Sequence, residues 1–239
     1  MSTFFRNSGT RIYGVSRSLS SSNSLNVDIR GSIAGILAGE IVAGQLRAGA
    51  HLNSVALARR FQTSRTPVRE AILMLEKAGL VEIESQRRPR VRRWSRAEIR
   101  EVYLVRAALY ALVAEQIVAN ASDDELHLLS ACYDELAAAE DACDLERFFA
   151  ANVAFREIEA RICHNSQLKQ IIDSLGLRVQ QLRHYSISLP SGMHESRSDR
   201  ERLIRAYYER DAQLAAALSR STVLRALARI EHSGWRGIE

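Results

Sequence analysis

The sequence predicts a mainly α-helical protein made of a small N-terminal part and a larger C-terminal bundle of helices. Apolar residues recur at helical spacing over most of the 239 residues, and only three prolines are present to interrupt helices. Alternation typical of strands is confined to two short segments, 81–84 and 90–93. Charge also divides the chain: residues 29–94 carry twelve basic and five acidic side chains, a net charge of +7, whereas residues 1–28 carry +2 and the remainder about −4.

Composition is ordinary for a soluble protein. Hydrophobic residues make up 46% of the chain, and no apolar run is long enough to span a bilayer, so we expect no membrane partner. The three cysteines, Cys132, Cys143 and Cys163, show no C-x-x-C pairing, which indicates reduced thiols and a cytoplasmic location.

Four segments follow from composition. Residues 1–27 are rich in Ser, Arg and Asn and contain no acid, which predicts a disordered tail. The same composition is also typical of an organelle transit peptide or of a start codon assigned too early, and we favour the tail. The predicted domains are 28–94 and 95–232, with a short tail at 233–239.

The domain at 28–94 contains three predicted helices and a hairpin. In order, its elements are a helix at 29–43 ended by Gly44, a loop at 46–52, a helix at 54–61 capped by Ser54, a turn at 62–64, a helix that begins near Arg65, and strands at 81–84 and 90–93 around a turn at 86–89. Three helices followed by a β-hairpin make a winged helix-turn-helix.

The helix that begins near Arg65 has two faces. Ala71, Ile72, Leu75 and Leu80 form an apolar stripe that needs a core. Its N-terminal end carries basic and hydroxyl side chains, where free N–H groups and the helix dipole already favour phosphate. The residues that we expect to contact double-stranded DNA are Arg59, Thr63, Ser64, Arg65, Thr66 and Arg69 around this helix, and Arg87, Arg88 and Arg90 in the hairpin.

These residues resemble a known family. The pattern is carried by Leu57-Ala58-Arg59-Arg60-Phe61, Ser64-Arg65-Thr66-Pro67-Val68-Arg69-Glu70-Ala71, Leu75 and Gly79-Leu80-Val81. Together they resemble the DNA-binding domain of GntR-type bacterial transcription regulators over residues 29–94. Two positions depart from the family: Ala48 replaces the proline before the second helix, and the wing turn carries Arg87-Arg88-Pro89 in place of glycine.

The C-terminal part reads as about six helices in an antiparallel bundle, with a capping box at Ser122 and Glu125. It resembles the FCD domain of the FadR-type branch over residues 95–232. The resemblance is carried by Glu101 to Leu109, Asn152-Val153-Ala154-Phe155-Arg156, Asn165, Leu168, Asp199-Arg200, Leu203-Ile204, Ala206 and Arg210-Asp211. It implies an effector-binding domain that contributes to a homodimer.

Many FCD domains hold a divalent metal with one Asp and three His. In this sequence those four positions fall on Asn152, Arg156, Arg200 and, within one residue, Thr222. Arginine is permanently protonated and cannot ligate a metal. We therefore predict no metal and no cofactor at this site.

The replacements indicate a different kind of site. Arg106, Arg156 and Arg200 lie on or beside apolar stripes that should face the bundle interior, and a buried guanidinium is costly unless an anion pairs with it. We predict a metal-free pocket for a small anion, a carboxylate or a phosphate, bound by Arg106, Tyr110, Asn152, Arg156, Arg200 and Thr222. The alternative is that the arginines pair with internal carboxylates such as Glu101, Glu115 or Glu157, or reach water.

The functional hypothesis is a homodimeric bacterial regulator that binds an inverted-repeat operator, a repressor relieved by a small anionic metabolite. The alternative is an architectural or ligand-free dimeric DNA-binding protein. An enzyme is the least favoured class, because the chain has no Ser/His/Asp set, no P-loop and no dinucleotide-binding fingerprint.

Overall fold

The computed structural model describes residues 24–84 and 88–234. Most of the expected N-terminal tail and the last five residues of the C-terminal tail lie outside the described residues. The first helix begins at Ser24, five residues earlier than predicted, so residues 24–27 are helical and not part of a tail.

The described chain forms two compact units. One unit holds residues up to 94 together with residues 176–181, and the other holds residues 95–175 and 182–234. Each unit is described by itself below.

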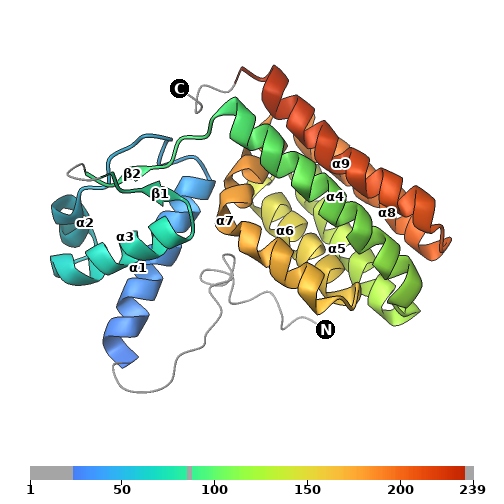
Figure 1. Cartoon of the computed structure of the whole chain (residues 1–239), viewed down its shortest axis with the longest axis horizontal. Helices are drawn as coiled ribbons and strands as arrows, with labels where there is room; N and C mark the ends of the chain where they lie inside the picture. Colours follow the sequence, from blue (N-terminus) through green and yellow to red (C-terminus); the bar gives the residue numbers. More distant parts are fainter. Residues whose placement is uncertain (1–23, 85–87, 235–239) are drawn as a thin grey trace. The chain divides into compact units, whose positions relative to one another are not determined.

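The first unit is a small helical domain with a hairpin. Its elements are α1 (Ser24–Val42), α2 (Ser54–Arg60), α3 (Arg65–Lys77), β1 (Val81–Glu82) and β2 (Arg90–Val91) (Figure 1). Helix α3 packs against α1 and α2, and Leu37, Ile41, Ala71, Leu75 and Val91 are buried together in the core. The apolar stripe predicted for the third helix therefore faces this core.

Two local predictions in this unit need correction. The cap of α2 is Asn53 and not Ser54, because the Asn53 side chain accepts a hydrogen bond from the Val55 amide at 2.9 Å. The strands are two residues long and not four, with Val81 opposite Val91 in an antiparallel pair.

The expected loop at 46–52 supplies part of the sheet-like pairing. The Gly49 amide donates to the Val91 carbonyl at 2.8 Å, and the Val91 amide donates to the Ala50 carbonyl at 2.9 Å. His51 forms an isolated antiparallel bridge with Arg90. The second strand is thus held on both sides over a very short length.

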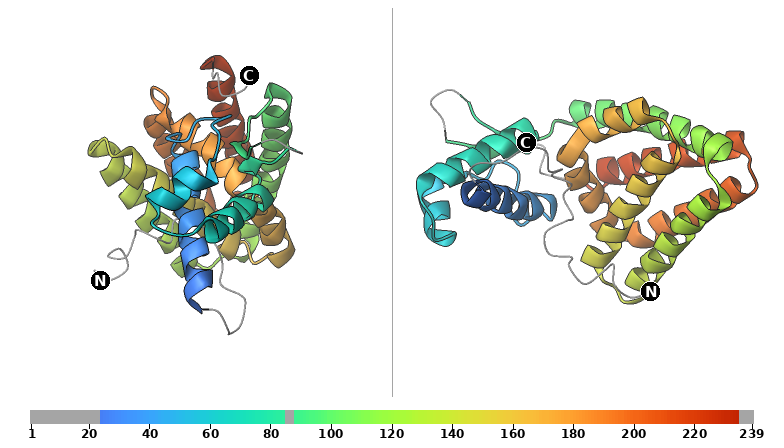
Figure 2. Two further views of the ribbon diagram at one scale, coloured as in Figure 1. Left: turned by 90° about the vertical axis from the view of Figure 1, so that its left-hand side faces the viewer. Right: turned by 90° about the horizontal axis from the view of Figure 1, so that it is seen from below.

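Six helices form the second unit, as predicted, although residues 176–181 within the fourth of them are assigned to the first unit. They are α4 (Arg96–Asn120), α5 (Asp123–Asp141), α6 (Leu145–Ile162), α7 (Ser166–Ser188), α8 (Gly192–Tyr208) and α9 (Ala212–His232). Helix α4 packs along α9, and α5 packs along α6 and α8 (Figure 2). The number of helices agrees with the prediction, but a kink at Gly176 inside α7, where φ is 57° and ψ is −156°, was not predicted.

Helix α4 corrects one expectation from composition. By its length and its apolar composition it could cross a membrane, although core helices of soluble proteins share these two properties. Tyr103, Ala107, Val113 and Ile117 on one side of it are buried in the bundle, and Arg106 is buried beside them.

The predicted capping box at the start of α5 is present and can be tested. Ser122 accepts a hydrogen bond from the Glu125 amide at 3.2 Å, and Glu125 accepts one from the Ser122 amide at 3.0 Å. Ser122→Ala should lower the free energy of unfolding by about 1 kcal/mol, since one helix-end amide loses its acceptor. Urea unfolding followed by circular dichroism measures this, and Ser122→Asp, which keeps an acceptor, should stay near wild type. Equal losses in both variants would contradict the cap.

Candidate functional site

The first candidate site is the exposed end of the helix-turn-helix in the first unit. Arg59 lies in the last turn of α2, Thr63 and Ser64 form the turn, and Arg65, Thr66 and Arg69 lie in the first two turns of α3. All are exposed except Thr63, which is half-buried. The Ser64 side chain makes no capping hydrogen bond, so its hydroxyl stays available at the helix end.

Ion pairs in this unit leave Arg65 and Arg69 without a carboxylate partner. Four of the five acidic residues at 29–94 pair with other arginines: Arg30 with Glu70 of α3 at 3.0 Å, Arg60 with Glu40 at 2.9 Å, and Arg90 with Glu82 and Glu84. Within the described residues, Arg59, Arg65 and Arg69 have no ion pair. Their charge adds to the positive end of the α3 dipole.

The three arginines predicted for the hairpin differ from those at the end of α3. Arg87 lies outside the described residues, and Arg88 is exposed. Arg90 donates from Nε to Glu82 Oε1 at 2.6 Å and also pairs with Glu84, and hydrogen bonding to Glu82 raises its pKa. Arg90 is therefore engaged by carboxylates of its own hairpin, and its role in DNA binding stays a prediction.

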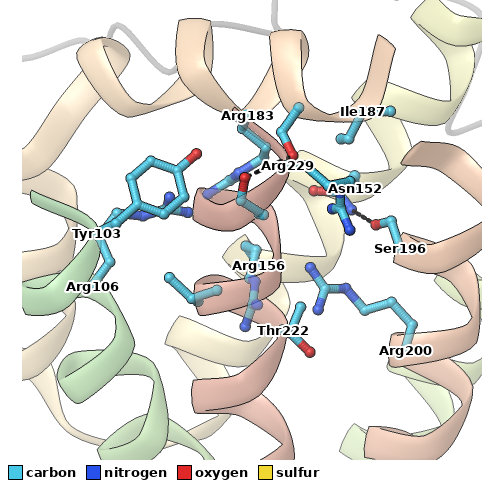
Figure 3. Close-up of a pocket in the computed structure, with 13 residues that line it drawn as sticks. Tyr103, Arg106, Asn152, Arg156, Arg183, Ile187, Ser196, Arg200, Thr222 and Arg229 are labelled. Atoms are coloured by element: carbon cyan, nitrogen blue, oxygen red, sulfur yellow. Dashed lines mark hydrogen bonds between the residues drawn. The ribbon is translucent and has the colours of Figure 1, made fainter. Parts of the chain in front are cut away.

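The second candidate site is a cavity of about 30 Å³ inside the helical unit. It brings together Arg106 from α4, Asn152 and Arg156 from α6, Arg200 from α8 and Thr222 from α9 (Figure 3). These are five of the six residues predicted to bind an effector. The sixth, Tyr110, does not line the cavity but supports it, since the Arg156 guanidinium lies 4.1 Å from the centre of its ring.

Arg156 has a built-in counter-ion. Its Nη1 donates to Glu159 Oε2 at 2.8 Å, and the Tyr207 hydroxyl donates to Glu159 Oε1 at 2.8 Å. Glu159 is completely buried and Arg156 nearly so. Burial opposes the charge of Arg156, but Glu159, Tyr110 and Tyr207 together outweigh it and raise the pKa of Arg156. Burial and Glu159 raise the pKa of Tyr207. These three side chains form a fixed, closed network.

Arg200 and Arg106 lack such a partner among the described residues. Nε and Nη1 of Arg200 are buried without any hydrogen bond, and burial together with the charge of Arg156 lowers its pKa to about 9. Arg106 is 4% exposed and forms no ion pair, although its guanidinium lies 4.7 Å from the centre of the Tyr103 ring. Both cations face the cavity without an anion.

Two arginines that line the cavity were not predicted from the sequence. Arg183 from α7 lines it, and burial lowers the pKa of its guanidinium to about 10, with Arg106 and Arg156 adding repulsion. Arg229 from α9 lines it too and pairs with Glu195 at 2.5 Å. Arg229 lies two helical turns after Thr222, so the face shared with Thr222 was a usable signal. No comparable signal pointed to Arg183.

The internal pairing considered from the sequence is present only in part. Glu101, Glu115 and Glu157 are exposed and form no ion pair with the cavity arginines in the described part of the chain. The partner of Arg156 is Glu159 instead.

The donor set does not fit a divalent metal. The four positions that the resemblance assigns to metal ligands hold an amide, two guanidinium groups and a hydroxyl, and permanently protonated arginine cannot ligate. No group of three or more His, Cys, Asp or Glu side chains suited to a metal occurs in the described residues. That the protein works without a metal or cofactor stays a prediction.

Comparison with known proteins agrees with both units. Residues 30–91 match the family model "Bacterial regulatory proteins, gntR family", and residues 101–225 match the FCD domain. A probable D-xylose utilization operon transcriptional repressor of Paenarthrobacter nicotinovorans is 29% identical over 59% of this chain and 62% of its own length. The HTH-type transcriptional repressor RspR of Escherichia coli is 27% identical over 63% of this chain and 66% of its own length. The chain thus spans less than two thirds of these relatives.

A solved structure shows the same fold. Escherichia coli McbR/YncC superposes with a TM-score of 0.72 at 21% identity, covering 89% of this chain and 99% of that protein. The named relatives are transcriptional regulators and not enzymes. The chain belongs to the gntR family of bacterial regulatory proteins and carries an FCD domain in its C-terminal part.

Proposed function

We propose that this protein is a cytoplasmic, homodimeric, DNA-binding transcription regulator whose helical unit binds a small anion. The observation that carries the proposal is the pairing pattern of the first unit. Its carboxylates neutralise Arg30, Arg60 and Arg90, whereas Arg65 and Arg69 at the exposed end of α3 keep their charge.

The geometry of α3 supports DNA reading. Arg65 and Arg69 are one turn apart and share an exposed face of the helix, which lies beside the buried stripe of Val68, Ala71 and Ile72. An arginine on such a face can hold guanine O6 and N7 with two hydrogen bonds or grip a phosphate, and Thr66 can bind a phosphate beside them. In a twofold dimer two such helices would read an inverted repeat.

The cavity supports regulation by an anion. Its lining includes five arginines, and only Arg156 and Arg229 have carboxylate partners within the described structure. An anion that binds one conformation of the bundle better than another would shift the equilibrium between them. Because two relatives are named repressors, we favour a repressor that the anion releases from DNA.

Helix α4 supports assembly with a second copy. On the side opposite its buried residues it exposes Leu104 (54%), Val105 (51%) and Leu112 (40%). An exposed apolar stripe of this kind on a helix is a candidate for a self-complementary interface between two copies.

A ligand-free dimeric DNA-binding protein remains the second candidate. The observation that favours it is the Arg156–Glu159 ion pair, which neutralises one cavity arginine from within the bundle.

DNA binding by α3 can be tested with a site selected from random-sequence duplex DNA. Arg69→Ala should weaken binding to this site roughly 5- to 150-fold, as expected for the loss of one base-reading arginine, and relax the preference at one position. Arg60→Ala is the matched control, because Arg60 is already paired with Glu40, and its affinity should stay within about threefold of wild type. Unchanged affinity and preference for Arg69→Ala would show that α3 is not the reading helix.

The dimer can be tested by sedimentation velocity. Leu104→Glu should convert the dimer to a monomer, because it places a charge in an apolar interface. Leu128→Glu on α5, where Leu128 is 44% exposed, serves as the control and should leave the dimer intact. A monomeric wild type, or a dimer that survives Leu104→Glu, would rule out this interface.

A further inference from the structure

The charge inventory of the cavity is unbalanced. Five arginines line it, and two carboxylates pair with them: Glu159 with Arg156 and Glu195 with Arg229. Asp199, the neighbour of Arg200 in the chain, pairs with Arg225 instead. Three cations, Arg106, Arg183 and Arg200, therefore lack an ion pair among the described residues.

Aromatic contacts compensate this charge only in part. The Arg200 guanidinium lies 4.9 Å from the centre of the Phe155 ring, and Arg106 lies over Tyr103 and Tyr110. A cation–π contact replaces only some of the hydration that a buried cation loses. Nε and Nη1 of Arg200 and Nε of Arg229 still have no acceptor. The cavity therefore calls for a ligand with several acceptor atoms and more than one negative charge.

The space available is small. A volume of about 30 Å³ has room for about two water molecules, since one water needs about 10–15 Å³ on this scale. A dicarboxylate distributes two charges over two separate groups, which together need more space than one group. A phosphoryl group places up to two charges and three acceptor oxygens on one centre.

We propose that the cavity selects a phosphoryl group, free or as a phosphomonoester, in preference to a carboxylate. Arg200 presents a forked donor suited to phosphate oxygens, and Arg106 and Arg183 supply further charge that no carboxylate pairs with in the described chain. Ser196 accepts a hydrogen bond from Asn152 Nδ2 at 3.0 Å, so its own proton is available to the ligand. This inference rests on the proposed anion site and names its ligand class.

One lining atom can accept a hydrogen bond from either source of phosphate. Asn152 Oδ1 is buried and lacks a donor among the described residues. A hydroxyl group on the organic part of a phosphomonoester can donate to it, and so can the one remaining proton of the hydrogen-phosphate dianion.

The binding experiment compares four probes by titration calorimetry in a phosphate-free buffer at constant ionic strength. The probes are inorganic phosphate, glycerol 3-phosphate, glycerate and malonate. We expect at least one phosphoryl compound to bind tenfold or more tightly than malonate, which has a similar charge spread over two groups. If malonate or glycerate binds as tightly as both phosphoryl compounds, the phosphoryl inference is wrong but the anion site stands.

Variants link the binding to the cavity. Arg200→Gln should weaken phosphoryl binding roughly 10- to 100-fold, and Arg200→Lys should be intermediate because it keeps the charge but loses the fork. Arg202→Gln, on the exposed side of the same helix, should bind like wild type. Since Arg200→Gln removes an unpaired buried charge, the variant without anion should melt no lower than wild type, which separates a binding defect from misfolding.

The failures of the two proposals are distinguishable. If none of the four probes binds, or binding is insensitive to Arg200→Gln, both the phosphoryl inference and the anion half of the proposed function are overturned. The DNA-binding half of the proposed function is tested separately, by comparing the DNA affinity of wild type with that of Arg69→Ala.

Discussion

Buried positive charge is the constraint on which the helical unit depends. Moving a guanidinium out of water costs several kcal/mol even after relaxation, and a desolvated cation–π contact returns about 2 kcal/mol. Glu159, with no exposed surface, offsets this for Arg156 and is itself held by Tyr207. The pKa of Arg200 falls to about 9 because burial and Arg156 disfavour its charged form. The folded state thus binds the Arg200 proton less tightly than the unfolded chain does. The loss of folding stability caused by the buried Arg200 charge therefore grows as the pH falls from the pKa of the unfolded chain towards 9. Below pH 9 it is fully present, and neutral pH lies in that range.

In the first unit, by contrast, the positive charge is exposed and accessible to a ligand. A net charge of +7 over residues 29–94 would repel itself if it were spread evenly. The ion pairs of Arg30, Arg60 and Arg90 place carboxylates beside arginines other than Arg65 and Arg69, and one of these carboxylates, Glu70, belongs to α3 itself. Exposed ion pairs of this kind contribute little to stability, on the order of 0–1 kcal/mol each. They leave Arg59, Arg65 and Arg69 without a carboxylate partner among the described residues, next to hydroxyl groups that can contact phosphate.

The sequence predicts most of the fold because its signals are local. Helix breaks, the Ser122 capping box and the apolar stripe of α3 depend on neighbours within a turn or two. The predicted strands were too long because their pairing depends on the segment at 49–51, which lies far away in the sequence. The kink at Gly176 was missed since an isolated glycine within a helical pattern is usually tolerated.

A resemblance supplied most of the cavity positions that could be predicted, and the apolar stripe around Arg106 supplied one more. Asn152, Arg156, Arg200 and Thr222 were located by analogy with metal ligands, and the structure brings all four to one cavity. Arg183 and the internal partner Glu159 had no such guide, because the face that each helix turns inward follows from tertiary packing. Glu159 lies only three residues after Arg156, a spacing that places both on one helix face, but an i,i+3 pair is more often exposed than buried.

Arginines at positions where metal ligands were expected would couple a ligand to the bundle in a different way. A metal can leave with its ligand, whereas Arg106, Arg183 and Arg200 are part of the chain and repel one another in the cavity. An anion that binds there offsets the repulsion between these buried cations, which strengthens its binding. Binding also raises the free energy of unfolding by RT ln(1 + [L]/Kd). A bound anion offsets this repulsion equally in any conformation of the bundle that keeps the arginines close together. Regulation therefore requires a second state in which they lie farther apart or reach water, because only a difference in affinity between two states can shift their populations. The fixed Arg156–Glu159–Tyr207 network is poorly suited to such movement, which leaves the unpaired arginines as the groups whose positions should differ between the two states.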